Sequence, residues 1–424
     1  MVKIGVIGGS GLDDPKIITD FKEKKVNTPY GWPSSVLTLG KIHGVEVVII
    51  ARHGKKHEIN PTKVNYQANI YALKQEGCTH ILATSAVGSL KQEIEPGDLV
   101  FPDQFIDFTR FRKNTYFDKY GDVQHVGMAE PFSSELRKMM MEECEQLKYK
   151  FHKKATIVII EGPRFSTKAE SFMFKNFADI IGMTTFPEII LANELEIQYV
   201  SIVMSTDYDC WKDDEEPVCF EMVLSRMKDN VEKVKQILIR VIPKIAKKDE
   251  DFIKNKIRTI PNFPKPGIMF RDITTLLLDS QGMKKTVEIF YNRYKDKKID
   301  IVAGIESRGF IIAGILADKL NVGMVPIRKK GKLPHDTIRQ DYALEYGMDT
   351  IEIHSDAIQP GNNVLLIDDL IATGGTARAA AQLIEKLGGK IEEISFIVEL
   401  PDLLGREKLK PWPVFSIINF EENR

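Results

Sequence analysis

The sequence predicts an α/β protein built mainly from parallel, buried strands. Three observations favour this class. Short runs rich in β-branched residues recur along the chain, apolar residues fall at helical spacing between several of them, and two of the runs end directly in glycine-rich turns. Strands that alternate with helices in this way are typical of sheets with both faces covered.

The expected strands are short apolar runs at Ile4–Ile7, Val45–Ile50, His80–Ala83, Ile157–Ile160, Val200–Met204, Ile301–Ile305, Val364–Ile367 and Ile394–Val398. The clearest helical patterns are at Asn65–Gln75, Ser134–Gln146, 220–242 and Ala377–Lys386. Helices between strands supply the crossover connections that parallel strands need.

The best candidate for a domain boundary is the stretch 243–260, PKIAKKDEDFIKNKIRTI. The expected helix 220–242 ends at Pro243, a charge-dense segment follows, and a proline-rich segment, IPNFPKPGIMFRDI (260–273), comes next. Such composition is typical of a domain junction, although a solvated helix face within one domain would look the same. We therefore expect two domains, 1–245 and 246–424.

Bulk composition disfavours several classes of protein. The 59 basic and 60 acidic side chains leave a formal net charge of −1, which gives no signal for binding nucleic acid or an anionic membrane. Cys78, Cys144, Cys210 and Cys219 have neither metal-like nor disulfide-like spacing, which favours a reduced compartment. The start, MVKIGVIGGSGLDD, does not read as a signal peptide, and no apolar stretch approaches the ~20 residues of a membrane span. We expect a soluble, cytoplasmic protein.

The stretch VLLIDDLIATGGTA (364–377) predicts a strand, two acids, a glycine-rich loop and a helix. Backbone N–H groups of such a loop can converge on an anion, and the helix N-terminus adds partial positive charge. Asp368 and Asp369 would then lie beside a phosphorylated sugar, where carboxylates accept from ribose hydroxyls or hold Mg²⁺ indirectly. A Walker-B-like strand end and a plain turn with solvated acids are the alternatives, and no GxxxxGK[ST] motif supports the first. The expected loop consists of Ala372, Thr373, Gly374, Gly375 and Thr376.

This stretch resembles the phosphoribosyl-diphosphate-binding motif of type I phosphoribosyltransferases. The surrounding motifs are similar to those of adenine phosphoribosyltransferases, in order and at family spacing across about 252–424. They are IPNFPKPGIMFRDI (260–273), GIESRGF (304–310), IRKKGKLPH (327–335), YALEYG (342–347) and VELPDLLGREKL (398–409). The resemblance implies a Rossmann-like domain that joins adenine to phosphoribosyl diphosphate, giving AMP and diphosphate.

The same resemblance implies roles for individual residues. The diphosphate would be bound by a loop made of Glu306, Ser307 and Arg308. It would also be bound by a cationic segment that covers the site, the hood, which carries Arg328, Lys329 and Lys332. Cations on a mobile hood can neutralise a departing diphosphate, although such a cluster alone would also fit a solvated loop. Glu345, which follows on the same hood, would accept the proton of the attacking base. Mg²⁺ would bind through the diphosphate and stabilise the leaving group, with no direct protein ligand.

The adenine pocket of this second domain would be lined by Met269, Phe270 and Arg271. These side chains are weak evidence, because the family selects its base largely through backbone groups.

The N-terminal half also begins with a strand and a glycine-rich turn, VIGGSGLDD (6–14). The turn is not GxGxxG, and no acid ends a second strand about 20 residues later, so a dinucleotide fold is disfavoured. A small-residue turn with Ser10 at its tip can instead hold a single phosphate. Arg52 and His53, in ARHGKKH (51–57), follow the strand 45–50 and offer a second anion contact.

These motifs resemble methylthioadenosine phosphorylases, the trimeric branch of the purine nucleoside phosphorylase superfamily. The match covers about 1–242 and includes VIGGSGLDDP (6–15), ARHG (51–54), NYQANIYALKQEGCTHILATSAVGSL (65–90), PGDLVFPDQFIDFT (96–109), MAEPF (128–132), EGPRFSTKAE (161–170), GMTTFPEIILANE (182–194) and STDYDCW (205–211). The resemblance implies a nucleoside-phosphorylase-type mixed sheet domain that cleaves methylthioadenosine with phosphate.

Residue roles again follow from motif position. Phosphate would be bound by Ser10, Arg52, His53, Ser85, Ala86 and Thr184, where the serines at 10 and 85 replace the family's frequent threonine and keep its hydroxyl. Phe165 would stack on the purine and Met183 would lie under the ribose, although both would also suit an ordinary core. His125 would reach the 5′-substituent pocket of a neighbouring subunit, or would simply be a surface histidine.

Asp207 and Asp209 would read the purine edge. Phosphorolysis passes through an oxocarbenium-like state, so an acid that donates to N7 helps the purine to leave. Asp207 could do this if burial keeps it neutral. Because an aspartate also accepts from a 6-amino group, adenine rather than hypoxanthine is the expected base. The family domain normally continues further than fits before residue 250, which leaves the choice between methylthioadenosine and adenosine open.

Together the halves predict a bifunctional purine salvage enzyme in which adenine released by the first domain is captured by the second. The expected partners are small molecules: methylthioadenosine, phosphate, adenine, phosphoribosyl diphosphate and AMP. A trimeric and a dimeric family on one chain predict a homo-oligomer, most simply a hexamer of D₃ symmetry. Two alternatives are a regulatory phosphoribosyl-diphosphate sensor and a chain in which one half is structural. The sequence has no recognisable DNA-binding arm, which disfavours the first. Every expected phosphate-binding position holds a suitable residue, which disfavours the second.

Overall fold

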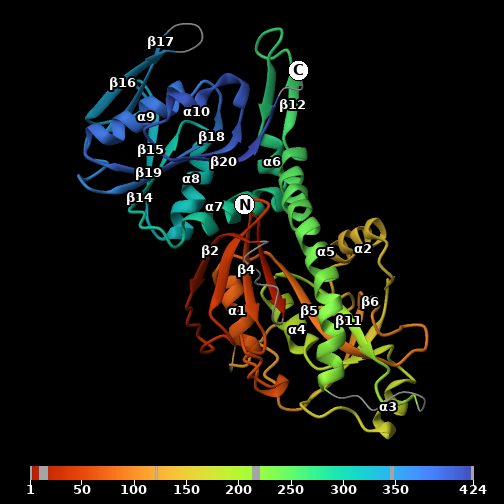
Figure 1. Cartoon of the computed structure of the whole chain (residues 1–424). Helices are drawn as coiled ribbons and strands as arrows, with labels where there is room; N and C mark the ends of the chain where they lie inside the picture. The colour runs from red at the N-terminus through yellow and green to blue at the C-terminus, as the bar shows by residue number, and fades with distance from the viewer. Residues whose placement is uncertain are drawn as a thin grey trace. The chain divides into compact units, whose positions relative to one another are not determined.

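The computed structural model describes residues 2–8, 18–119, 121, 123–212, 220–343 and 348–421, without the side chains of 220–225, 227–229 and 343. Two compact units are present, Val2–Lys247 and Lys248–Arg424, and each has its own sheet (Figure 1). The division predicted at 245/246 stays a prediction about which segments fold independently. Ser10, Cys219 and Glu345 lie outside the described residues.

The N-terminal unit is a mixed sheet with helices on both faces. Its strands are β1 (Lys3–Gly8), β2 (Thr19–Lys24), β3 (Leu37–Ile42), β4 (Val45–Ala51), β5 (His80–Ser89), β6 (Leu99–Val100), β7 (Gln104–Phe108), β8 (Phe151–His152), β9 (Thr156–Ile160), β10 (Ile180–Gly182) and β11 (Gln198–Asp207). Its helices are η1 (Pro61–Lys63), α1 (Tyr66–Gln75), α2 (Ser134–Leu147), α3 (Lys168–Phe174), α4 (Thr185–Glu194) and the first part of α5 (Phe220–Asn255).

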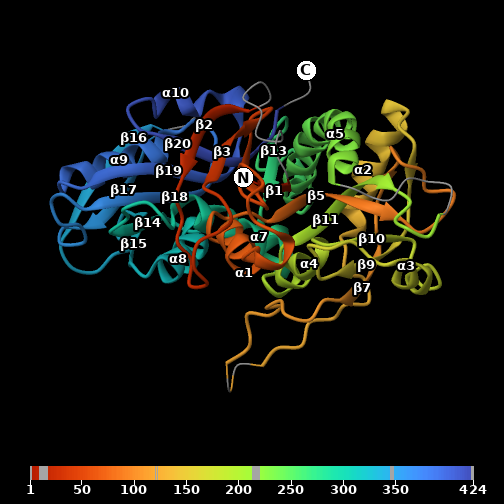
Figure 2. The ribbon, with the colours of Figure 1, turned by 60° about the horizontal axis from the view of Figure 1, so that its bottom comes forward.

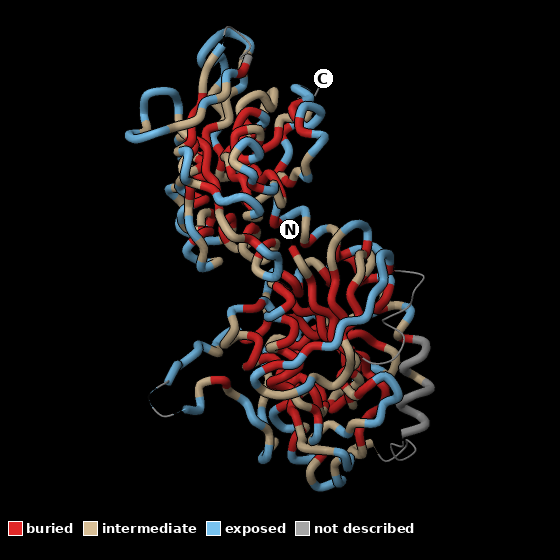
Figure 3. Tube along the Cα trace, turned by 90° about the vertical axis from the view of Figure 1, so that its left-hand side faces the viewer, coloured by how far each residue is buried: buried red, intermediate tan, exposed pale blue. Residues whose placement is uncertain are grey.

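Side-chain alternation along the strands separates two apolar clusters. Val48 and Ile50 pack with α1 and α4 on one face, whereas Val47 and Ile49 pack with α2 and α5 on the other. This period of two is what a strand buried on both faces requires. Figure 3 shows the buried residues concentrated along these strands.

The sheet divides along β5. The first half of β5 pairs with β1 through His80–Ala83, whereas its end pairs with β10 through Gly88 and Ser89. On its other side β5 pairs with β11 along almost its whole length. Residues 84–87 therefore have a sheet partner on one side only, and the other side is free to line a site.

The C-terminal unit is a seven-stranded sheet in the order β16-β17-β15-β14-β18-β19-β20, beside a separate β12–β13 hairpin. The strands are β12 (Arg258–Pro261), β13 (Met269–Asp272), β14 (Ile301–Ile305), β15 (Gly323–Lys329), β16 (Thr337–Ala343), β17 (Met348–His354), β18 (Asn363–Ile371), β19 (Lys390–Glu399) and β20 (Val414–Asn419). The helices are α6 (Thr274–Leu278), α7 (Ser280–Tyr294), α8 (Gly309–Leu320), α9 (Gly375–Lys386), η2 (Pro401–Leu403) and α10 (Gly405–Lys408). Strands β15-β14-β18-β19-β20 are parallel, and the antiparallel pair β16–β17 extends one edge.

Each predicted strand lies within an observed one, and the α/β class is confirmed. The predicted end of the helix at Pro243 is wrong, because α5 continues to Asn255 with Pro243 inside it. A proline in a helix removes one hydrogen bond. Ile242 and Ile245 are buried in the N-terminal core and Ile253 in the C-terminal core, so apolar contacts on both sides of the proline offset that loss. Within the described residues, no helix is both long and apolar enough to cross a membrane.

Candidate active sites

One cavity of about 680 Å³ in the N-terminal unit brings together most of the predicted site residues. Its lining includes Arg52, His53, Ser85, Ala86, Phe165, Met183, Thr184, Asp207 and Asp209. They come from the ends of β4, β10 and β11, from the middle of β5 and from the loop after β9. Residues far apart in sequence thus meet where the sheet divides. His125 is exposed and does not line the cavity. It belongs to the segment between β7 and α2, part of which forms the projecting arm in Figure 2.

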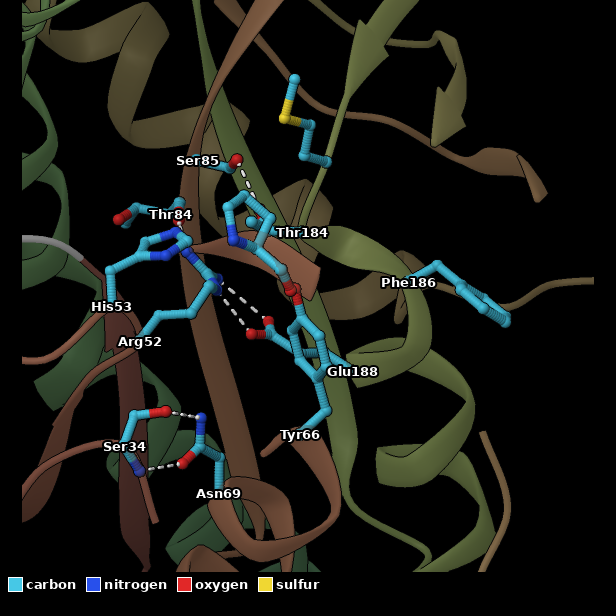
Figure 4. Close-up of polar contacts among 12 residues, drawn as sticks. Ser34, Arg52, His53, Tyr66, Asn69, Thr84, Ser85, Thr184, Phe186 and Glu188 are labelled. Carbon is cyan, nitrogen blue, oxygen red and sulfur yellow. Dashed lines mark hydrogen bonds and ion pairs between the residues drawn. The ribbon is translucent and has the colours of Figure 1, made fainter. Parts of the chain in front are cut away.

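Arg52 is buried at the end of β4 with its guanidinium held in place. Its Nε and Nη2 donate to the two carboxylate oxygens of Glu188, at 2.5 and 2.9 Å, and Nη1 donates to the Thr84 carbonyl at 2.7 Å (Figure 4). Burial alone would lower the pKa of Arg52, but the Glu188 carboxylate more than offsets it and the pKa is raised. Two N–H groups of the guanidinium remain to face the cavity. Arg52 can therefore contact an anion only in the orientation that Glu188 sets.

His53 is neutral in this setting. Its Nδ1 lies 2.8 Å from the Ile59 carbonyl, and a carbonyl only accepts, so Nδ1 carries the proton. Burial, and then the neighbouring Arg52, lower the pKa of His53 to about 4. Near neutral pH its Nε2 is therefore a hydrogen-bond acceptor rather than a cation.

Two hydroxyl groups meet on the wall of the cavity. The Ser85 and Thr184 side-chain oxygens are 2.8 Å apart, and both residues are almost fully buried (Figure 4). Ser85 comes from β5, and Thr184 precedes α4. Hydroxyls in such a place can rotate to donate to an anion.

The two predicted acids lie side by side at the end of β11. The Asp207 carboxylate accepts from the Thr206 hydroxyl at 2.7 Å and from the Asp209 N–H at 2.8 Å. Burial raises the pKa of Asp207 to about 6. The Ser166 hydroxyl donates to the Asp209 carboxylate at 2.6 Å, which fixes its orientation. One acid is thus easily protonated and the other is held as an acceptor.

Glu188 and Ser166 were not predicted as site residues, although both lie in motifs named above. The available signal for Glu188 was its position as the one charged residue in the apolar stretch TTFPEIILA. A charged side chain in such a stretch is buried only when it has a partner. Ser166 follows Phe165 in EGPRFSTKAE and has no local pattern that distinguishes it from a loop residue.

The second candidate site lies at the carboxyl ends of β14 and β18. Gly309 begins α8 beside β18, and a Cβ there would lie 2.8 Å from the Ile367 carbonyl oxygen and 3.1 Å from Asp368 Oδ1. Glycine therefore permits the GIESRGF turn to approach the two acids. Arg308, from that turn, pairs with Asp369 at 2.7 Å. The predicted diphosphate loop and acidic pair are adjacent.

The surroundings of the acidic pair disfavour ionisation of both carboxyl groups at once. Desolvation raises the pKa of Asp368 well above its usual range, and the Asp369 carboxylate raises it further. Desolvation also raises the pKa of Asp369, although the Arg308 guanidinium partly offsets this effect. Two carboxylates face one guanidinium, so the site can accommodate further positive charge.

The glycine-rich loop follows β18 and is supported from behind by the C-terminal motif. Gly374 has φ of 76°, in the left-handed region that favours glycine, and a Cβ there would lie 2.5 Å from the Gly405 carbonyl oxygen. A Cβ on Gly405 would lie 2.1 Å from the Ala372 carbonyl oxygen. The lining loop and the LLGREKL segment therefore depend on each other's lack of a side chain. Thr373, Gly375 and Thr376 complete the loop and the start of α9.

Two of the predicted hood cations, Arg328 and Lys329, are paired with carboxylates in this structure. Arg328 donates to both carboxylate oxygens of Glu306, at 3.0 and 3.2 Å. Lys329 Nζ lies 3.5 Å from Asp349 Oδ2 on β17. The backbone N–H of Lys332 donates to the buried Glu352 at 3.0 Å. Glu306 thus acts through its carboxylate on Arg328, and the peptide bond between Glu306 and Ser307 is cis.

The predicted adenine-pocket residues do not share one face. Phe270 lies near the acidic pair, with the Arg308 guanidinium 5.5 Å from its ring centre. Arg271 is next on β13, and side chains alternate along a strand, so it points to the opposite face. There its guanidinium lies 4.2 Å from the Phe420 ring centre, and Nη1 donates to Thr259. Met269 is 40% exposed.

The chain has known relatives. Residues 3–243 match the Phosphorylase superfamily, and residues 274–423 match the Phosphoribosyl transferase domain. The chain belongs to the phosphorylase superfamily. Its N-terminal part is 54% identical over 255 residues to the S-methyl-5′-thioadenosine phosphorylase of Danio rerio. The match covers 59% of this chain and 91% of that protein. The predicted resemblance to both families is confirmed at this level.

Solved structures agree with the sequence relatives. A methylthioadenosine phosphorylase from Schistosoma mansoni in complex with adenine is 42% identical, has a TM-score of 0.56 and covers 58% of this chain and 92% of that one. A mutant of an adenosine/methylthioadenosine phosphorylase from Schistosoma mansoni, also with adenine, is 41% identical with a TM-score of 0.56, and covers the same shares, 58% and 92%. The phosphorylase-type sheet followed by a phosphoribosyltransferase-type domain is thus the fold of this superfamily member.

Proposed function

We propose that the N-terminal unit cleaves 5′-methylthioadenosine with phosphate, giving adenine and 5-methylthioribose-1-phosphate. The observation that carries this proposal is the single cavity that joins the predicted phosphate, ribose and base residues. Relatives that carry the name of this activity match the unit over most of their length.

Each side of the cavity has chemistry suited to one part of the reaction. A phosphate oxygen attacks C1′ of the ribose, and the bond from C1′ to N9 of the purine breaks. Ser85, Thr184 and the free N–H groups of Arg52 would hold the attacking phosphate. Neutral Asp207 would give its proton to N7, so that the bonding electron pair leaves on a neutral purine. Asp207, through its second oxygen, and Asp209, held by Ser166, would both accept from the 6-amino group.

The choice between methylthioadenosine and adenosine is the finer question. One structural neighbour is described as acting on both nucleosides. Both substrates present the same adenine edge to Asp207 and Asp209, so adenosine is the second candidate substrate. The two differ only at the 5′ position, where His125 of a neighbouring subunit is our proposed contact.

We propose that the C-terminal unit transfers the phosphoribosyl group to adenine. Adenine N9 would attack C1 of phosphoribosyl diphosphate, diphosphate would leave, and AMP would form as N9 loses its proton. The support is the convergence of Arg308, the acidic pair and the glycine-rich loop at one sheet edge, with Phe270 beside them. Glu345 is our proposed proton acceptor.

Mg²⁺ is the cofactor that this chemistry implies. Two carboxyl groups, Asp368 and Asp369, beside the single guanidinium of Arg308 fit a cation carried by the diphosphate, which would favour their ionised form. When bound there, Mg²⁺ would stabilise the negative charge of the leaving group. Arg328, released from Glu306, would add a bidentate contact to the same group.

The two half-reactions can be tested separately on the full chain. Methylthioadenosine should yield adenine only when phosphate is present, and added adenine should yield AMP only with phosphoribosyl diphosphate and Mg²⁺. Hypoxanthine in place of adenine should give little IMP. Adenine release without phosphate would contradict phosphorolysis, and equal use of hypoxanthine would contradict adenine selection.

A further inference from the structure

Arg112, in the N-terminal unit, lies beside the cavity but does not line it, and all of its N–H groups donate to protein atoms. Arg112 lies at the start of the arm that follows β7, and its side chain is 1% exposed. It is not among the cavity-lining residues. A buried guanidinium that does not face the substrate space requires another explanation.

The contacts of Arg112 reach two loops and the start of α4, and its Nη1 also lies 3.4 Å from the Tyr66 hydroxyl of α1. Its Nη1 donates to the Met183 and Phe186 carbonyls, both at 2.6 Å. Its Nη2 donates to the Ile160 and Glu161 carbonyls, at 3.3 and 2.8 Å, and Nε donates to Glu161 Oε1 at 3.3 Å. All five N–H groups of the guanidinium are therefore used, and none remains for a substrate.

Those loops carry the two halves of the proposed site. The loop after β9 leads from Ile160 to Phe165 and Ser166, on the base side. The loop after β10 carries Met183 and Thr184, on the ribose and phosphate side. The loops also touch directly, since a Cβ on Gly162 would lie 2.7 Å from the Met183 sulfur atom. Under the proposed function, the separation of these loops would set the distance between the base and the phosphate.

The arm is anchored at the same place. The Glu161 carboxylate accepts from the backbone N–H groups of Arg110 and Phe111, at 2.6 and 3.2 Å. Glu194 accepts from the Thr115 hydroxyl and the Tyr116 N–H, at 2.6 and 2.7 Å. The root of the arm is thus bound to the framework that also holds the site loops.

We propose that Arg112 is a positioning residue that fixes the base-side loop and the phosphate-side loop relative to each other. This inference rests on the proposed phosphorolysis, because it names the groups being positioned. A lysine cannot replace it, because an ammonium offers three donors from one point and cannot reach four carbonyls and a carboxylate.

The test compares Arg112→Lys and Arg112→Ala with Lys113→Ala, a change at the adjacent, exposed lysine of the same segment. We expect both Arg112 variants to raise KM for phosphate and lower kcat/KM by about tenfold or more, because misplaced groups lose orientation. Lys113→Ala should behave as wild type. A variant that is merely less stable would lower the active fraction, and hence kcat, at unchanged KM.

Hydrogen exchange gives a readout independent of the reaction. In Arg112→Lys, peptides covering 160–166 and 183–187 should exchange faster together, whereas a peptide within α2 should not change. Unchanged KM with unchanged exchange in both loops would overturn the proposal. If the wild-type chain fails to cleave methylthioadenosine, the proposed function fails, and the exchange experiment still decides the role of Arg112.

Discussion

At the scale of single residues, Asp207 is the group that we propose as the proton donor of the first site. Its carboxylate is buried at the end of β11, and burial raises its pKa to about 6. A protonated acid is needed to donate to N7, whereas Asp209 accepts a hydrogen bond from the Ser166 hydroxyl. Two adjacent carboxylates thus have different tasks because their surroundings differ.

Asp207→Asn should change the preferred base. An amide can donate to a 6-oxo group, so inosine-type nucleosides should be cleaved better relative to methylthioadenosine. The rate with methylthioadenosine should fall by about 100-fold or more, the usual effect of losing a general acid. Competition assays with both nucleosides measure the ratio. A variant that still rejects inosine and cleaves methylthioadenosine at the wild-type rate would disprove this role.

The pH dependence follows from the direction of the same shift. Because the native pKa of Asp207 is raised to about 6, the proton is present below that pH and is lost as the pH rises through it. The kcat/KM for methylthioadenosine should therefore decline on the alkaline side of about pH 6. This limb should be missing from the profile of Asp207→Asn, and its persistence there would assign it to another group.

At the scale of elements, the sequence predicted strands better than connections. Apolar runs such as Val364–Leu366 are buried on both faces and read as strands without knowledge of their neighbours. Helix α5 passes Pro243 because contacts on both sides of the proline hold it, and a local rule cannot include those contacts.

The site residues divide in the same way. Arg52 and Asp207 lie in motifs that resemble a known family, so their places could be predicted. Glu188 and Arg112 act on partners 136 and 71 residues away, and no local spacing reveals such a pair. Arg271 was placed with Phe270, but strand alternation sends the two side chains to opposite faces.

The glycine-rich loop of the second site offers a test at this scale. Gly405→Ala would place a Cβ 2.1 Å from the Ala372 carbonyl oxygen, so the loop must move. The KM for phosphoribosyl diphosphate should rise about tenfold or more, because the loop's N–H groups lose their alignment. Methylthioadenosine phosphorolysis should not change. Steady-state kinetics of both half-reactions measures this.

Gly314→Ala is the matched control, since a Cβ at that position on α8 meets nothing within 4 Å. It should leave both reactions unchanged and stabilise the helix slightly. A Gly405→Ala protein with wild-type kinetics would show that the LLGREKL segment does not shape the phosphate loop.

At the scale of the whole molecule, the two pentosyl transfers that we propose would share adenine as product and substrate. Phosphorolysis is reversible in principle, and consumption of adenine by the second unit would draw it forward. Removal of adenine by the second unit would therefore favour the first reaction, which is a chemical reason for joining the two units on one chain.

The resemblances also predict an assembly, which stays a prediction. A threefold contact through the N-terminal unit and a twofold contact through the C-terminal unit close most simply as a D₃ hexamer. Light scattering should then give about six times the 48.2 kDa of one chain. The mass of a single chain would rule this assembly out and leave His125 without the neighbouring site we assign to it.

The central claim is that both units act and are joined by adenine, and one assay tests it most directly. The purified chain is incubated with methylthioadenosine, phosphate, Mg²⁺ and phosphoribosyl diphosphate, beside a sample that lacks the last, and products are identified by mass spectrometry. We predict AMP in the first sample and free adenine in the second. Absence of adenine and AMP from both samples, while AMP still forms from added adenine, would contradict the claim for the N-terminal unit.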